Sequence, residues 1–107
     1  MTATKIAELN DRLRRTFTGG KVLLTAAVAS LDPSVQIEVL ERVRSFADFN
    51  ADNDPHREHD FGVVTVEGER YFFKVDYYDL TMDCGSEDPS DPAVTTRVLT
   101  VGHMSDY

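Results

Sequence analysis

The sequence predicts an α+β fold, a two-layer sandwich in which an antiparallel sheet of about four strands carries two helices on one face. Two stretches have apolar residues three and four positions apart, as amphipathic helices do. Four shorter apolar stretches are expected to be strands, and three of them follow one another late in the chain. The expected order is α-β-α-β-β-β. We expect the 107 residues, 1–107, to form a single domain.

The first helix is expected to begin at a cap on Thr4 and to end near Phe17. Its apolar stripe consists of four residues at helical spacing: Ile6, Leu9, Leu13 and Phe17. Three cations near its end complement the helix dipole: Arg12, Arg14 and Arg15. Two glycines then stop the helix, and the apolar run Lys21–Ser30 is expected to be a buried strand. The alanines in this run leave a helix possible there.

The second helix has the clearest signals in the sequence. Either Ser30 or Asp32 can cap it, and Pro33 suits its first turn. It should end near Phe49, and six residues define its buried face: Val35, Val39, Leu40, Val43, Phe46 and Ala47. The segment Asn50–Asp60 that follows is rich in Asn, Asp and Pro, which favour turns, so we expect a loop.

Three strands are expected in the second half of the chain. Phe61–Val66 and Tyr71–Tyr78 are rich in β-branched and aromatic residues, and the short link Glu67–Glu69 contains a glycine, so the two should form a hairpin. Asp79–Pro92 is a long acidic loop with two prolines. Val94–Val101 is the last expected strand.

Six short stretches spread along the chain form a distinctive set. They are LND at 9–11, DNDP at 52–55, EHDFG at 58–62, KVDYYD at 74–79, GSEDP at 85–89 and TRVLTV at 96–101. The set resembles a family of small bacterial proteins without an assigned function, with Phe72-Phe73 where the family pattern suggests one bulky aromatic residue. The resemblance implies a stand-alone domain without known chemistry. Because members look like accessory proteins of plasmids and phages, it also implies a context of mobile genetic elements.

Charge is divided unevenly between the two halves of the chain. Residues 1–47 hold seven Lys/Arg and five Asp/Glu, a balance of +2, whereas residues 48–107 hold four and fourteen, a balance of −10. The sum is the net charge of −8. Because an unpaired buried charge is costly, most of these carboxylates must lie at the surface. An anionic surface attracts cationic partners and repels nucleic acid and anionic membranes.

These observations favour an acidic protein–protein interaction module that occupies a basic, nucleic-acid-binding surface of a host defence complex, as an anti-CRISPR or anti-restriction inhibitor does. The expected partner is a basic protein or ribonucleoprotein, with no cofactor, metal or catalytic residue, and a monomer is favoured. Eleven carboxylates are expected to bind it: Asp48, Asp52, Asp54, Glu58, Asp60, Asp76, Asp79, Asp83, Glu87, Asp88 and Asp91. The absence of an apolar leader segment and a single cysteine, Cys84, indicate a cytoplasmic protein.

Two alternative functions remain open at this point. One is a small metal-dependent hydrolase that uses the 52–60 and 76–79 carboxylates; its residues would be Asp52, Asp54, His59, Asp60 and Asp76. The 52–60 segment does not have the spacing of an EF-hand, and an Asx-rich turn that bonds to its own backbone explains it more simply. The other alternative is an accessory or antitoxin-like subunit with one dedicated basic partner.

Overall fold

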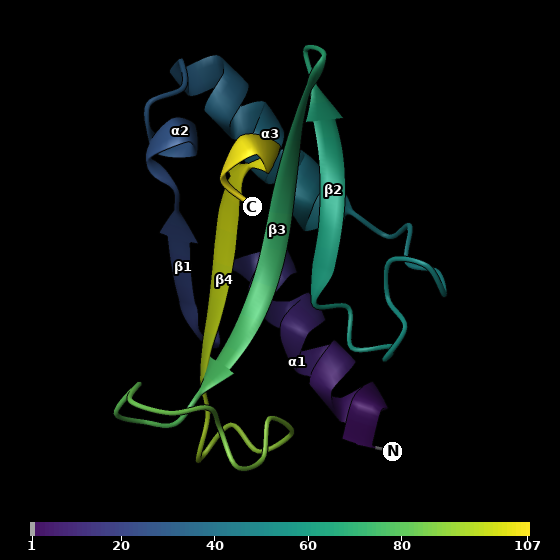
Figure 1. The fold of residues 1–107 in the computed structure, drawn as a ribbon, viewed down its shortest axis with the longest axis vertical. Coiled ribbons are helices and arrows are strands. Elements are labelled where there is room, and N and C mark those ends of the chain that lie inside the picture. Colours follow the sequence, from purple (N-terminus) through teal and green to yellow (C-terminus); the bar gives the residue numbers. More distant parts are fainter. Residues whose placement is uncertain (1) are drawn as a thin grey trace.

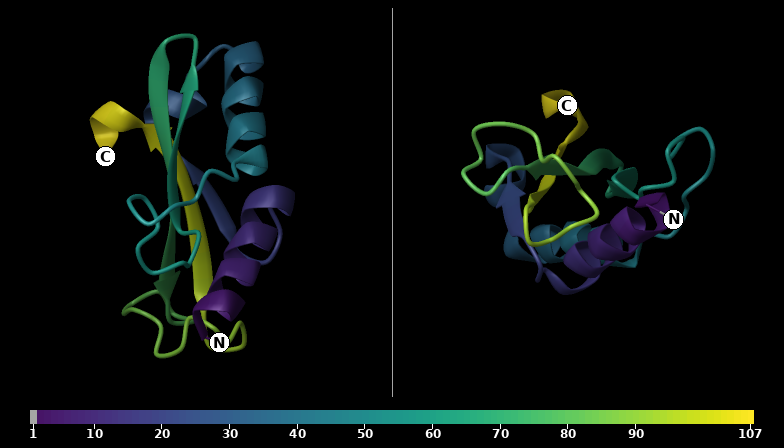
Figure 2. Two further views of the ribbon diagram at one scale, coloured as in Figure 1. Left: turned by 90° about the vertical axis from the view of Figure 1, so that its right-hand side faces the viewer. Right: turned by 90° about the horizontal axis from the view of Figure 1, so that it is seen from below.

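The computed structural model describes residues 2–107, which form one four-stranded sheet with helices against it (Figure 1). Its elements, in chain order, are α1 Thr2–Thr16, β1 Lys21–Leu24, α2 Ala26–Ala29, α3 Pro33–Ser45, β2 Phe61–Val66, β3 Glu69–Tyr78, β4 Thr96–His103 and the short 3₁₀ helix η1 Met104–Asp106. Figure 2 shows α1 and α3 on the same side of the sheet. The predicted α+β class is therefore confirmed, with the predicted number of strands.

The sheet is mixed rather than antiparallel. Its strand order is β1-β4-β3-β2, and the pairs β2–β3 and β3–β4 are antiparallel. β1 runs parallel to β4, with Lys21 opposite Val98 and Leu24 opposite Val101. A parallel pair needs a long crossover connection, and here α2, α3 and the β2–β3 hairpin all lie in chain order between the two strands. The expectation of a wholly antiparallel sheet was therefore wrong at one edge.

Helix α1 begins earlier than predicted. The helix already includes Thr2, so Thr4 lies inside its first turn and is not the N-cap. Its end is close to the prediction: Phe17 takes the left-handed conformation, with φ of 56°, and its N–H donates to the carbonyl of Leu13 at 2.8 Å. This is the arrangement that usually selects glycine after a helix.

The run Lys21–Ser30 is not one buried strand. Only its first four residues form β1, and as an edge strand β1 is partly open to solvent, with Leu23 51% exposed. The alanine-rich remainder forms α2, in keeping with the high helix propensity of alanine. The helix left possible by the alanines is therefore the conformation found.

Helix α3 starts at the predicted place, with Asp32 at the N-cap position and Pro33 in the first turn, although the Asp32 side chain makes no capping hydrogen bond. The helix ends at Ser45 rather than near Phe49. The carbonyls of Val43 and Arg44 both accept hydrogen bonds from the Arg14 guanidinium, at 3.0 Å each. A longer helix would need these carbonyls for its own next amides. Ala47, predicted to be buried, is exposed outside the helix.

The β2–β3 hairpin has a tighter turn than predicted. β2 has the predicted bounds, but only two residues link it to β3, Glu67 and Gly68, with φ of 50° and 80°. Positive φ at both positions is typical of the type I′ turn that two-residue hairpins prefer. The last strand, β4, begins two residues later than predicted and extends to His103.

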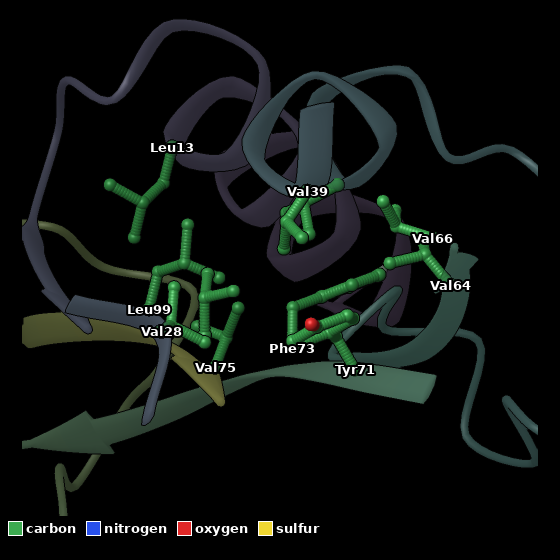
Figure 3. Close-up of a cluster of buried hydrophobic side chains, with 11 residues drawn as sticks. Leu13, Val28, Val39, Val64, Val66, Tyr71, Phe73, Val75 and Leu99 are labelled. Atoms are coloured by element: carbon green, nitrogen blue, oxygen red, sulfur yellow. The ribbon is translucent and has the colours of Figure 1, made fainter. Parts of the chain in front are cut away.

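The core lies between the sheet and the helices (Figure 3). Leu13 of α1, Val28 of α2 and Val39 of α3 meet Phe73 and Leu99 of the sheet, and all five are inaccessible to solvent. None of the helices within residues 2–107 is long and apolar enough to cross a bilayer.

The face of the sheet opposite α1 and α3 receives η1 and the residue after it (Figure 2). The ring of Tyr107 lies 5.0 Å from that of Phe72 and 5.1 Å from that of Phe61, measured between centroids. Glycine is required at position 102, because an added Cβ would lie 2.6 Å from the Phe72 ring.

Candidate functional site

The eleven predicted carboxylates lie in two loops and on one strand. The first loop, residues 46–60, follows α3, and the second, residues 79–95, joins β3 to β4 at the lower end of the view in Figure 1. Five are exposed: Asp48, Asp52, Asp83, Glu87 and Asp88. Five are half-buried: Glu58, Asp60, Asp76, Asp79 and Asp91. The remaining one, Asp54, is only 5% exposed.

Asp54 organises the first loop from inside. Its Oδ1 atom accepts hydrogen bonds from the backbone N–H groups of Glu58, at 3.0 Å, and His59, at 3.1 Å. His59 and Arg57 both have positive φ, 56° and 58°, which is costly for residues other than glycine. The carboxylate therefore stabilises a strained turn, and the interpretation of this segment as an Asx-rich turn is confirmed.

His59 ties the first loop to α1. Its Nδ1 atom lies 3.0 Å from Oδ1 of Asp11, and its Nε2 atom lies 3.7 Å from Oδ2 of Asp54. Its ring stacks on that of Phe49, with 4.1 Å between centroids and 1° between planes. Asp11 also accepts a hydrogen bond of 2.9 Å from Arg14. The imidazole is therefore held on both edges and on one face.

A buried polar network joins both loops to α1 and the sheet. Asn10, which is fully buried, accepts a 2.6 Å hydrogen bond from Nε of Arg97. Its amide nitrogen donates to the Tyr77 hydroxyl at 2.8 Å and to the Glu58 carbonyl at 3.0 Å. The Tyr77 hydroxyl in turn donates to the Glu58 carboxylate at 2.9 Å, and Arg97 donates to the carbonyl of Pro89 in the second loop.

Burial shifts the ionisation of several groups in and beside this network. It raises the pKa of Tyr77 far above its usual value; Asn10 opposes this shift and the Glu58 carboxylate adds to it. It lowers the pKa of Arg97, against the influence of Tyr77 and Glu58. Burial also raises the pKa of Asp60, and the nearby Glu58 and Asp54 carboxylates act in the same direction. The network thus holds a neutral tyrosine between a guanidinium and a carboxylate.

Of the residues in this network, only Glu58 was among the predicted site residues. Asn10 lies within the apolar stripe of α1, four residues after Ile6 and three before Leu13, so a polar residue on the buried face was the available signal. Arg97 follows a threonine in a strand, where nothing local indicates that its side chain is only 2% exposed. Its burial depends on contacts with α1 and with the second loop, which are distant in sequence.

The residues of the hydrolase alternative are not gathered in one place. Asp54 and His59 are in contact, as described, but Asp76 belongs to the face of β3 opposite Tyr77 and pairs with Lys74 at 3.0 Å. This contact raises the pKa of Lys74. Within residues 2–107, no three His, Cys, Asp or Glu side chains are placed so that they could hold a metal ion.

The second loop, residues 79–95, is called the acidic loop below. It has five carboxylates and no lysine, arginine or histidine: Asp79, Asp83, Glu87, Asp88 and Asp91. It also exposes three large apolar side chains, namely Leu80, Met82 and Val94. A groove of about 360 Å³ opens among these groups, lined by Asp79, Leu80, Cys84, Gly85, Glu87 and Val94.

Asp79 fixes the start of the acidic loop. Its Oδ1 atom accepts hydrogen bonds from the Thr81 hydroxyl at 3.0 Å and from the N–H of Asp83 at 3.1 Å. Desolvation works to raise the pKa of Asp79, but these and neighbouring N–H groups outweigh it, so the pKa lies below its usual value. The negative charge of this residue therefore stabilises the turn that it begins.

Removing the Tyr77 hydroxyl tests the buried network. Tyr77→Phe is expected to lower the free energy of unfolding by about 1–3 kcal/mol, because Asn10 and Glu58 each lose a partner in a part-buried site. Urea denaturation followed by circular dichroism measures the loss. Tyr78→Phe is the matched control, since no hydrogen bond within residues 2–107 involves its hydroxyl. Equal losses from both variants would contradict a stabilising role for the network.

Comparisons with known proteins place the chain in a family. A model of the family described as "Protein of unknown function (DUF3768)" matches residues 24–106, from the end of β1 to η1. No curated protein and no solved structure matches the sequence. The matched segment contains the first loop, the acidic loop and most of the sheet, so the chain belongs to this family of proteins of unknown function.

Proposed function

We propose that the protein is an interaction module that binds a cationic protein or ribonucleoprotein surface through the acidic loop and the first loop, residues 46–60. The observation that carries the proposal is the composition of the acidic loop, which combines five carboxylates, no cationic residue and three exposed apolar side chains. Charges attract a basic partner from a distance, and apolar side chains stabilise the complex once it has formed. A loop that served only as a connection would need neither feature.

Few of the candidate carboxylates are neutralised by a cation of the same molecule. Among the eleven candidates, ion pairs within residues 2–107 involve only Asp54, with His59, and Asp76, with Lys74. Figure 1 shows the acidic loop at the lower end of the view, whereas the first loop lies beside β2, higher and to the right. The carboxylates of each loop therefore contribute to an outward negative field at the place where that loop lies.

The more specific form of the proposal is an inhibitor of a host nucleic-acid defence complex in the cytoplasm. The carboxylates would occupy a basic surface that normally binds phosphates, as an anti-CRISPR or anti-restriction protein does. Its support is the high negative charge, the small size and the mobile-element context that the family resemblance implies. An accessory or antitoxin-like subunit would use the same surface on one dedicated basic partner.

Neutralising exposed carboxylates without changing their shape tests the proposal. The triple variant Asp52→Asn, Asp83→Asn, Glu87→Gln is expected to bind poly-L-lysine at least about tenfold more weakly, because each exposed pair contributes several tenths of a kcal/mol or more. Calorimetry at low and high salt measures the affinity. In the unmodified protein, binding should weaken strongly as salt is added.

The control has the same change in net charge at other places. Glu38→Gln, Glu41→Gln and Glu67→Gln neutralise two acids of α3 and one of the hairpin turn, all outside the first loop and the acidic loop. The loss of affinity in this control variant should be at most half of the loss in the loop variant. Equal losses in the two variants would show that binding follows net charge alone and would overturn the proposal.

A further inference from the structure

We propose that the groove in the acidic loop anchors one lysine or arginine side chain of the partner, a proposal that rests on the proposed function. The aliphatic stem of that side chain would lie against Leu80 and Val94, and its charged end would meet Glu87. All three residues line the groove of about 360 Å³, which has room for one such side chain with its flanking backbone. The groove would thus supply a fixed contact point within a larger charged surface.

The groove is formed by a turn that holds its apolar wall open to solvent. The N–H of Asp79 donates to the carbonyl of Cys84 at 2.8 Å, and the N–H of Met82 donates to the carbonyl of Asp79 at 3.0 Å. Between these bonds Leu80 is 63% exposed, the most exposed of the large aliphatic side chains. Met82 has φ of 61°, a strained conformation that the hydrogen bonds stabilise. A wall fixed before binding needs little ordering when a partner arrives.

The two carboxylates in the groove have different tasks. Asp79 already accepts hydrogen bonds from Thr81 and Asp83, which hold it in the turn. No hydrogen bond or ion pair within residues 2–107 involves the side chain of Glu87, which is exposed. Glu87 is therefore the carboxylate available to a cation at the groove.

Charge decides which occupant fits. Leu80 and Val94 alone would suit any apolar side chain, but the surrounding loop has five carboxylates and no cation. Lysine and arginine combine an aliphatic stem with a terminal positive charge, so the stem matches the apolar walls of the groove and the charge matches the surrounding carboxylates. A second copy of this chain, with its net charge of −8, would be repelled.

Two peptides of equal charge separate anchoring from simple attraction. One alternates lysine with glycine; the other replaces each lysine by diaminobutyrate, which keeps the ammonium group but has a shorter stem. If a stem lies in the groove, the lysine peptide should bind about tenfold more tightly, since each buried methylene adds to affinity. Nuclear magnetic resonance titration of the ¹⁵N-labelled protein measures both affinities and shows which amides respond.

A substitution at the exposed wall provides the second measurement. Leu80→Ser should remove most of the preference for the lysine peptide while the salt dependence stays the same, because no charge changes. Leu23→Ser is the matched control, since Leu23 is also a half-exposed leucine but lies on the edge strand β1. It should leave both affinities unchanged.

The outcomes distinguish the groove from the function on which it rests. Equal, salt-sensitive binding of the two peptides, unaffected by Leu80→Ser, would overturn the groove and leave the interaction module intact. Tight binding of an uncharged leucine–glycine peptide at the same amides would also overturn it, because the occupant would then be apolar. Failure of the lysine peptide to bind at low salt would overturn both proposals.

Discussion

Replacing Arg14 with methionine is expected to lower the free energy of unfolding by about 3–5 kcal/mol, the usual loss when one partner of a buried charged contact is removed. Arg14 is completely buried, and its guanidinium donates to the carbonyls of Val43 and Arg44 and to the carboxylate of Asp11. Methionine fills much of the volume, but each of these acceptors loses the hydrogen bond from the guanidinium. Urea denaturation should show a lower midpoint with an unchanged slope.

The adjacent arginine gives the control for this prediction. Arg15 is on the same helix and also faces Asp11, but its side chain is 59% exposed and lies 4.0 Å from the carboxylate. Arg15→Met should cost less than about 1 kcal/mol, as exposed ion pairs generally do. If the two variants lose equal stability, the contact of Arg14 with the end of α3 does not contribute as proposed.

Replacing Arg97 with methionine is expected to lower the free energy of unfolding by about 2–4 kcal/mol, because one buried and one part-buried acceptor lose their donor at once. These acceptors are the side-chain oxygen of Asn10 and the carbonyl of Pro89. Arg97→Lys should not restore the stability, since one ammonium group cannot reproduce the fork of a guanidinium. The loss should also loosen the acidic loop, to which Pro89 belongs.

A double-mutant cycle isolates the contact between Arg97 and Asn10. The double variant Asn10→Leu, Arg97→Met should lose less free energy of unfolding than the sum of the two single variants, by about 0.5–3 kcal/mol. Once one partner has been replaced, the second substitution no longer leaves a buried polar group without its hydrogen bond. Arg70→Met, on the exposed start of β3, should have little effect. Strict additivity at Asn10 and Arg97 would contradict the network as described.

The parts of the fold that depend on local pattern were predictable from the sequence. The β2–β3 hairpin and the start of α3 have turn residues, a proline and apolar spacing that act over a few positions. The end of α3 was not predictable from spacing, since Phe46 and Phe49 continue the helical period. They instead reach the ring of Phe73 from outside the helix, at 5.2 and 6.3 Å between centroids. The pairing of β1 with β4 is similarly decided by contacts far apart in the sequence.

The candidate site was predictable in composition and not in geometry. The carboxylates of the acidic loop could be read from the sequence, as could the Asx-rich turn before β2. The network that holds both loops could not be, because it depends on polar residues placed in an otherwise apolar interior. The arginines of α1 illustrate the limit: Arg14 does meet a helix C-terminus, as expected of a cation there, but the helix is α3.

The position of β4 between β1 and β3 has a consequence for synthesis. A nascent chain that extends only to the end of β3 has a hairpin and a separate edge strand, and the strand that joins them has not yet been translated. Residues 21–24 must wait for residues 98–101, and contacts so distant in sequence slow folding. The residues before β4 are therefore expected to leave the ribosome before the sheet can form. During that interval the apolar faces of the strands stay exposed to chaperones.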